Sequence, residues 1–129
     1  MAGVQITDYV LQHGQGMHGS FGRANTFQFM SAIGPDFKKQ FVDQVPVSNA
    51  DIAPTLAQIL GLDLISKGKL KGRVLREALK GGPESIPFER RTAISGSAAN
   101  GKKTILMYQQ LEKQVYFDEA CLNNSAGCR

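Results

Sequence analysis

The sequence has only two cysteines and two histidines among its 129 residues, so few side chains are available for a disulfide or a soft metal ion. Both cysteines, Cys121 and Cys128, lie in the C-terminal segment ACLNNSAGCR. Two thiolates with no second pair and no nearby histidine do not form a structural zinc clip. Oxidation would close a small loop between Cys121 and Cys128, whereas a reducing compartment would leave two thiols, and the spacing leaves both states open.

Long apolar stretches are also missing. No segment approaches the length that crosses a bilayer, and residues 1–12 have neither a basic leader nor an uninterrupted apolar run. We therefore expect a cytoplasmic protein without a membrane-spanning segment. The composition, 42% hydrophobic and 20% charged, is that of an ordinary globular protein, and the length predicts a single domain over residues 1–129.

The positive charge is not gathered into a binding stripe. The chain has a net charge of +4, but its basic residues occur as scattered short groups beside turn residues. Nucleic-acid binding is not predicted, because no interleaved aromatic residues and no recognition helix accompany these groups. The groups are Lys38–Lys39, Lys67–Lys71, Arg90–Arg91 and Lys102–Lys103.

Hydrophobic patterning predicts two strands and a helix in the first half of the chain. Residues 4–11 are expected to form a short strand, and residues 26–33 a strand that is buried on both faces and stops at the turn Gly34–Asp36. The clearest helix signal is SNADIAPTLAQILG at residues 48–61. Polar residues can cap its first turn, aliphatic residues repeat with helical spacing, and Gly61 ends it.

The second half predicts a shorter helix and then a set of hairpins. Residues 73–79 have helical spacing and are followed by two glycines. After residue 90 the period changes to that of strands, which we expect at 91–98, 104–110 and 114–117, with a turn at Asn100–Gly101. The predicted fold is therefore a mixed α and β (α+β) domain with two helices and a C-terminal antiparallel β-meander.

The segment HGQGMHGSFGR, residues 13–23, is rich in glycine and contains both histidines. It matches the G-x-G-x-x-G pattern of dinucleotide sites, but no helical pattern follows, so no helix N-terminus would face the phosphates. His18, with Met17 and Gly19 beside it, suits a crowded metal site because its small neighbour lets the backbone approach the ion. One imidazole is not a metal site, and the residues alone favour an ordinary loop histidine.

Three segments taken in order resemble a known family. They are GMHGSFGRANTFQFMSAIGPDFK, VSNADIAPTLAQILGL and GRVLREAL. From about Gly14 to Asp118 the chain resembles the C-terminal part of alkaline phosphatase superfamily enzymes, in the type I phosphodiesterase and nucleotide pyrophosphatase branch. The resemblance implies a partial alkaline-phosphatase-like sheet. It also implies two-metal hydrolysis of phosphate mono- or diesters as the chemistry of the family.

The resemblance carries a small number of residue roles onto this chain. His18 matches the family histidine that binds zinc, and Gly16 and Gly19 would shape its loop. Asn49 and Asp51 match a helix start that packs below the site, where we expect them to cap the helix and not to bind metal.

The chain departs from the family in its catalytic residues. The nucleophile, and the aspartate and Asp-His ligands of the family, belong to an N-terminal portion that this sequence does not contain, and it has no Asp-His dipeptide. No catalytic residue is therefore assigned. Zinc binding through His18 alone is expected to be weak or absent, because affinity needs several converging ligands. We expect no phosphoric ester hydrolase activity from this chain by itself.

These observations leave three functions open. The chain is interpreted first as a truncated phosphodiesterase-like domain, with a small self-associating interaction module and a subunit that completes a two-metal site with a separate chain as alternatives. Strand edges left without the rest of the sheet predict a homo-oligomer. Family members are often exported, which leaves the compartment open despite the cytoplasmic expectation.

Overall fold

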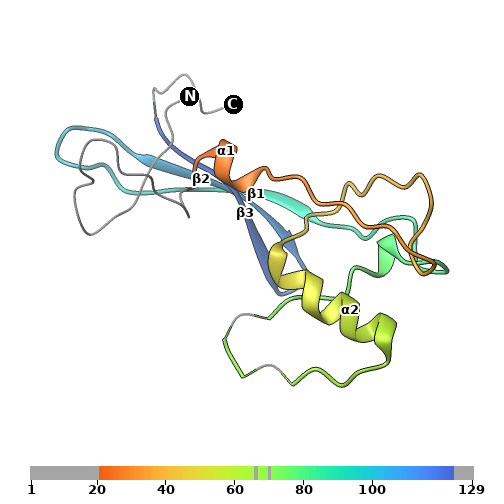
Figure 1. Ribbon diagram of the computed structural model, residues 1–129. Coiled ribbons are helices and arrows are strands. Elements are labelled where there is room, and N and C mark those ends of the chain that lie inside the picture. Colours follow the sequence, from red (N-terminus) through yellow and green to blue (C-terminus); the bar gives the residue numbers. More distant parts are fainter. Residues whose placement is uncertain (1–20, 66, 70, 124–129) are drawn as a thin grey trace, which may run out of the picture. The chain divides into compact units, whose positions relative to one another are not determined.

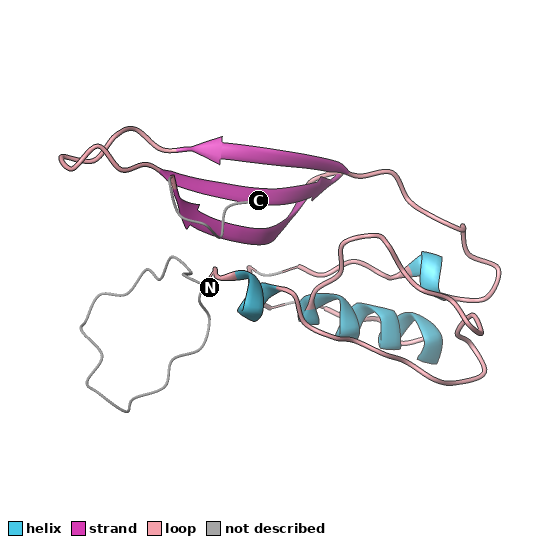
Figure 2. Cartoon of the chain, turned by 90° about the horizontal axis from the view of Figure 1, so that it is seen from above, coloured by secondary structure: helices cyan, strands magenta, loops and turns pink. Residues whose placement is uncertain are grey.

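The computed structural model describes residues 21–65, 67–69 and 71–123. Within them the protein has the mixed α+β fold that its sequence predicts (Figures 1 and 2). The strand expected at residues 4–11 lies outside the described residues. The elements in chain order are α1 (Arg23–Thr26), the 3₁₀ turn η1 (Asn49–Asp51), α2 (Ile52–Leu60), the 3₁₀ turn η2 (Arg76–Ala78), β1 (Glu89–Ile94), β2 (Thr104–Leu111) and β3 (Gln114–Leu122).

The described residues divide into two compact units. One unit contains residues 21–30 and 89–123, and the other contains residues 31–88. The second unit is therefore a continuous stretch of chain inserted between two segments of the first. α1 and the sheet belong to the first unit, and α2 with both 3₁₀ turns belongs to the second.

The three strands form an antiparallel meander in the order β1, β2, β3, which confirms the predicted hairpins (Figure 2). Gly101 has the positive φ of 74° that the predicted turn between β1 and β2 requires. β3 runs on to Leu122, beyond the expected end at Phe117. Its added residues Ala120 and Cys121 are almost fully buried, so they help to form the core of this unit.

A strap formed by residues 21–26 lies against β3. The backbone N–H of Ala120 donates to the carbonyl of Phe21 at 2.8 Å, and the rings of Phe21 and Phe117 meet edge to face with centroids 5.3 Å apart. The guanidinium of Arg23 pairs with the carboxylate of Asp118 at 3.0 Å. These contacts attach the start of the described chain to the last strand of the sheet.

The expectation of a buried strand at residues 26–33 is wrong. Thr26 ends α1, and its hydroxyl donates to the carbonyl of Asp118. No strand of the described residues pairs with the segment that follows, so the ladder hydrogen bonds that would fix an extended strand are not formed. Phe27, Phe29 and Ile33 are 73%, 91% and 100% exposed. The apolar composition of this segment predicted that it is buried, but a segment is buried only where other parts of the protein pack against it.

η1 and α2, which follow one another directly, together confirm the helix predicted at residues 48–61. The Ser48 hydroxyl accepts from the backbone N–H of Ala50, and the Asp51 carboxylate accepts from the backbone N–H of Ser48, which together make a capping box. Gly61 ends the helix with a φ of 64°, in the left-handed region that glycine adopts without strain. The local sequence signals are sufficient to define both ends of this helix.

The prediction of a second helix at residues 73–79 is wrong, because the only helical part of this segment is the short 3₁₀ turn η2. Leu79 is extended and forms a bridge with Phe37. The backbone N–H of Lys38 donates to the carbonyl of Ala78 at 2.9 Å, and the backbone N–H of Lys80 donates to the carbonyl of Asp36 at 2.8 Å. This long-range backbone pairing takes the residues that a helix would need for its last turn, and it outweighs the helical propensity of the segment.

Candidate functional site

Most of the site residues that were predicted from the sequence lie outside the described residues. Gly16, His18 and Gly19 lie there, and so does Cys128, which leaves the zinc and disulfide predictions as predictions. Cys121 is described, and it is completely buried in β3.

Within residues 21–123, apart from 66 and 70, no three His, Cys, Asp or Glu side chains lie close enough together to hold a metal ion.

The residues at the end of the glycine-rich segment, from Gly22 on, are held by hydrogen bonds and an ion pair. Gly22 is buried, and its carbonyl accepts from the N–H groups of Asn25 and Thr26. The guanidinium of Arg23 bonds to the carboxylate of Asp118 and lies 4.8 Å from the centre of the Phe27 ring. Its role in the structure is to hold the strap on β3.

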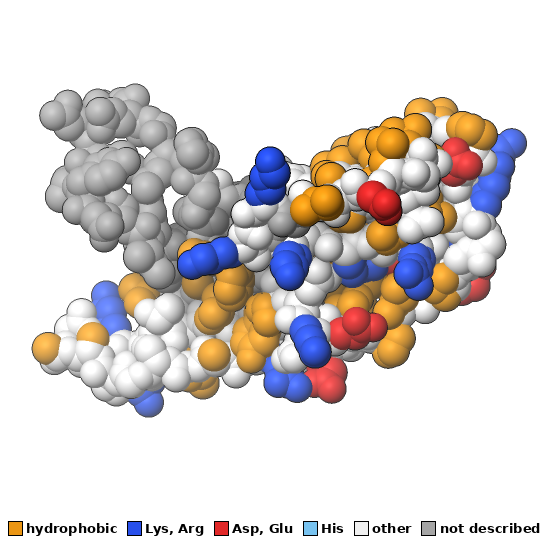
Figure 3. Space-filling model, turned by 90° about the horizontal axis from the view of Figure 1, so that it is seen from below, with side chains coloured by type: hydrophobic (Ala, Val, Ile, Leu, Met, Phe, Trp, Pro, Cys, Tyr) orange, Lys and Arg blue, Asp and Glu red, His pale blue; other side chains and the backbone are white. Residues whose placement is uncertain are grey.

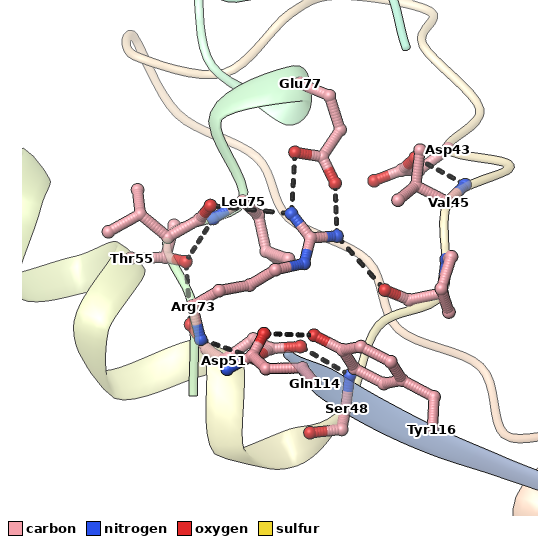
Figure 4. A network of polar contacts seen from close by, with 12 residues as sticks. Asp43, Val45, Ser48, Asp51, Thr55, Arg73, Leu75, Glu77, Gln114 and Tyr116 are labelled. Atoms are coloured by element: carbon pink, nitrogen blue, oxygen red, sulfur yellow. Dashed lines mark hydrogen bonds and ion pairs between the residues drawn. The ribbon is translucent and has the colours of Figure 1, made fainter. Parts of the chain in front are cut away.

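The densest polar cluster lies in the second unit, around Asp51 (Figure 4). The Asp51 carboxylate is 1% exposed, and its two oxygens accept from the backbone N–H groups of Ser48 and Arg73, both at 2.8 Å. One side chain thus closes the capping box of η1, the turn that runs directly into α2, and attaches a segment that comes about twenty residues later. The expected capping by Asp51 is found at η1, whereas its side chain makes no cap hydrogen bond to α2 itself.

Thr55 makes a second link between the same two segments. Its hydroxyl donates to the carbonyl of Asp51 at 2.7 Å and accepts from the N–H of Leu75 at 3.0 Å. Thr55 is 3% exposed, so both bonds are shielded from water. The one proton of this hydroxyl is therefore donated in a hydrogen bond, and its oxygen accepts a second hydrogen bond.

Arg73 and Glu77 form a buried, bidentate ion pair (Figure 4). One guanidinium nitrogen donates to Glu77 Oε2 at 2.9 Å, and the other donates to Glu77 Oε1 and, at 3.0 Å, to the carbonyl of Pro46. The side chain of Glu77 is fully buried. Burial alone would favour its neutral form, but the bonds from Arg73 outweigh burial and hold the pKa of Glu77 below its ordinary value.

Asp43 is the third carboxyl group of this cluster. Its Oδ1 accepts from the N–H of Val45 at 2.9 Å, while its Oδ2 is buried and has no hydrogen-bond partner among the described residues. Figure 4 shows the carboxyl group of Asp43 beside that of Glu77, whose two oxygens point to the guanidinium of Arg73. Burial raises the pKa of Asp43, and the charge of Glu77 adds to this effect. The hydrogen bond from the N–H of Val45 and the charge of Arg73 oppose it only in part.

The cluster binds the protein to itself and presents no reactive group to a ligand. The guanidinium of Arg73 is occupied by Glu77 and Pro46, and the Asp51 carboxylate is occupied by backbone N–H groups. Perturbed carboxyl groups often mark catalytic sites, but structural ion pairs perturb pKa values as well. We assign this cluster a structural role.

Sequence reasoning did not identify Asp43, Arg73 and Glu77. One signal was present, because Arg73 precedes Glu77 by four residues, the spacing of a helical ion pair. The pair forms although only a short turn of helix is present, since Glu77 lies in η2. The position of Asp43 beside it depends on tertiary packing and has no local signature.

Comparison of the chain with protein families, with curated proteins and with solved structures gave no match. Among the described residues, no helix has the length and apolar character needed to cross a membrane.

Proposed function

We propose that this chain corresponds to the C-terminal part of an alkaline phosphatase superfamily phosphodiesterase, that it serves as scaffold, and that it does not hydrolyse phosphoesters alone. One observation supports the proposal. The two later segments of the resemblance, VSNADIAPTLAQILGL and GRVLREAL, pack together through the bonds of Asp51 to Arg73 and of Thr55 to Leu75. Residues that resemble one family in sequence thus form one physical unit.

In this proposal His18 is the single metal ligand that the chain contributes. Zinc in such enzymes supplies a Lewis acid that stabilises phosphoryl oxygens, and its remaining ligands would come from other polypeptide. The described residues would anchor the end of the glycine-rich segment, because the strap of residues 21–26 is bonded to β3.

The test is hydrolysis of a chromogenic phosphodiester by the purified chain, with and without added zinc, for the wild type and His18→Ala. We expect no turnover under any of these conditions, because one ligand and no nucleophile do not make a two-metal site. Turnover that requires both zinc and His18 would contradict the proposal, since it would mean that this chain completes a site by itself.

A second candidate is a subunit that completes the site together with a separate chain. Ile52, Leu56 and Leu60 of α2 are 42%, 47% and 67% exposed, which favours this candidate because apolar surface of this kind is normally covered by protein. Isolation of the chain from its source in complex with a larger protein that carries Asp-His motifs would favour this candidate over the scaffold proposal. Self-association without such a protein would favour the interaction module.

A further inference from the structure

The chain that follows α2 is exposed at each of its described positions. Leu62 is the last residue bonded to the helix, because its backbone N–H donates to the carbonyl of Ala57 at 2.9 Å. Among the described residues from there to η2, no helix or strand forms, and Figure 1 shows this stretch as a loop beside α2. We call it the lysine loop, and its described residues, all exposed, are 61–65, 67–69 and 71.

Two lysines of this loop, Lys67 and Lys69, lie on either side of Gly68. Neither lysine makes a hydrogen bond or an ion pair within the part of the chain that the structure describes. An endoprotease of basic specificity binds the side chain before the cleaved bond through an aspartate in its specificity pocket. Gly68 has no Cβ, so the backbone after Lys67 can adopt an extended conformation at little steric cost.

Exposure of a basic side chain is not sufficient for cleavage. Residues 1–20 contain no lysine or arginine, so every basic residue except Arg129 belongs to the described part of the chain. Figure 3 shows such side chains at several separate places on one face. A protease also needs the backbone around the cleaved bond to be released from its own hydrogen bonds. The hydrogen bonds of the backbone therefore decide which bond is cut.

The turn between β1 and β2 provides the comparison, because Lys102 and Lys103 are exposed there as well. The carbonyl of Lys102 accepts from the N–H of Ala98 at 2.8 Å. The N–H of Lys103 donates to the side-chain oxygen of Asn123 at 2.7 Å. Both polar groups of the peptide bond that joins these two lysines are thus held within the sheet unit, and this bond is protected.

The lysine loop ends where Gly72 packs against η1. A Cβ atom at Gly72 would lie 1.9 Å from the carbonyl oxygen of Ala50, so the backbone atoms of the two residues are in close contact. The next N–H, that of Arg73, donates to the Asp51 carboxylate at 2.8 Å. One side of the bond after Lys71 is therefore covered, whereas Lys67 and Lys69 come before this contact.

The contacts that hold each unit together join residues on opposite sides of the lysine loop. In the second unit these are the hydrogen bonds between Asp51 and Arg73 and between Thr55 and Leu75. In the first unit the strap of residues 21–26 precedes the loop and β3 follows it. None of these contacts requires an unbroken backbone in the loop, so both units can keep their structure after it is cut.

We propose that the lysine loop is a site of limited proteolysis by an endoprotease that recognises lysine. Cleavage after Lys67 or Lys69 converts the protein into two polypeptides that remain folded together without a covalent link between them. In the reaction one water molecule adds across the peptide bond. Its hydroxyl group gives the lysine a terminal carboxyl group, and its remaining hydrogen gives the following residue a terminal amine. The two new termini ionise with opposite charge, so the net charge at pH 7 does not change.

The test is limited digestion of the full chain with trypsin in native buffer, with the fragments identified by mass spectrometry. The first cut is expected after Lys67 or Lys69. It should be at least about tenfold faster than cleavage after Lys102 or Lys103, because the turn must lose its hydrogen bonds before it can be cut. On size-exclusion chromatography with light scattering, the cut protein should keep the molar mass of the intact chain.

The variant Lys67→Gln/Lys69→Gln removes the side chains that the protease recognises and keeps the length and polarity of the loop. Its first cleavage should be at least about tenfold slower than that of the wild type. Its melting temperature should be unchanged, because neither side chain contacts its own unit through a hydrogen bond or an ion pair. Lys102→Gln/Lys103→Gln is the matched control, since it removes the same number of lysines from an exposed turn, and its first cleavage should proceed as in the wild type.

Three results would overturn the proposal. The first is an initial cut at any site other than Lys67 or Lys69. The second is a first cleavage of equal rate in the wild type and in Lys67→Gln/Lys69→Gln. The third is a cut protein whose two polypeptides separate in native buffer, which would mean that the contacts across the lysine loop do not hold the units together.

Discussion

The buried oxygen of Asp43 makes the stability of the second unit sensitive to pH. Because burial and the nearby Glu77 raise its pKa above the ordinary 3.8, the folded chain holds this proton more tightly than the unfolded chain does. Protonation of Asp43 therefore adds to the free energy of unfolding at low pH. This contribution is lost as the pH rises above 3.8 and through the pKa of the folded chain. A protonated Asp43 can also donate to Glu77, which an ionised one cannot.

Asp43→Asn should remove this dependence, because an amide keeps an acceptor for Val45 and does not titrate. We expect the variant to gain stability relative to the wild type as the pH rises between about pH 4 and pH 7, measured by urea unfolding of both proteins in parallel. A difference in stability that does not change with pH would show that Asp43 is not perturbed in the folded chain.

At the scale of elements, η1 and the segment before η2 approach each other so closely that Gly72 has no room for a side chain. A Cβ atom at Gly72 would lie 1.9 Å from the carbonyl oxygen of Ala50 and 2.8 Å from the N–H nitrogen of Asp51. Both are backbone atoms and cannot rotate away. This approach is what allows the N–H of Arg73 to reach the Asp51 carboxylate.

Gly72→Ala should therefore lower the free energy of unfolding by about 1–3 kcal/mol, the range for overpacking, as measured by chemical denaturation. Gly96→Ala is the control, because a Cβ there would have no heavy atom within 4 Å and the residue has no positive φ. The control should change stability by less than about 0.5 kcal/mol. Equal effects of the two substitutions would contradict the close approach.

The elements that sequence predicted correctly carry their signals within a few residues. Ser48 and Asp51 cap η1, Gly61 ends α2, and the Asn100–Gly101 turn defines the first hairpin. The predictions for residues 26–33 and 73–79 were wrong because the secondary structure of these segments depends on contacts with residues far away in the sequence. One segment found no strand to pair with, and the other found a backbone partner near Phe37.

The same distinction applies to the candidate site. The caps around Asp51 were predictable because they are local, whereas the contact of Asp43 with Glu77 joins residues that no local pattern connects. The roles expected for Gly16, His18 and Gly19 came from a family resemblance and stay predictions.

At the scale of the whole molecule, the two units are expected to lose structure separately. Hydrogen exchange of Gly72→Ala, followed by mass spectrometry, should show reduced protection within residues 43–79 and unchanged protection in β2 and β3. The reason is that the contacts of Gly72 lie within the second unit. Reduced protection across both units to the same degree would mean that they unfold as one.

The strap on β3 also sets an order in which the chain can fold during its synthesis. Arg23 and Asp118 are 95 residues apart, and all of residues 31–88 leave the ribosome between them. The second unit can therefore fold before β3 exists, whereas Phe21 and Arg23 have nothing to bind until the last strand emerges. By then the folded second unit has shortened the flexible loop between them, which lowers the entropy cost of closing it. The first described residues of this protein are thus among the last to reach their native contacts.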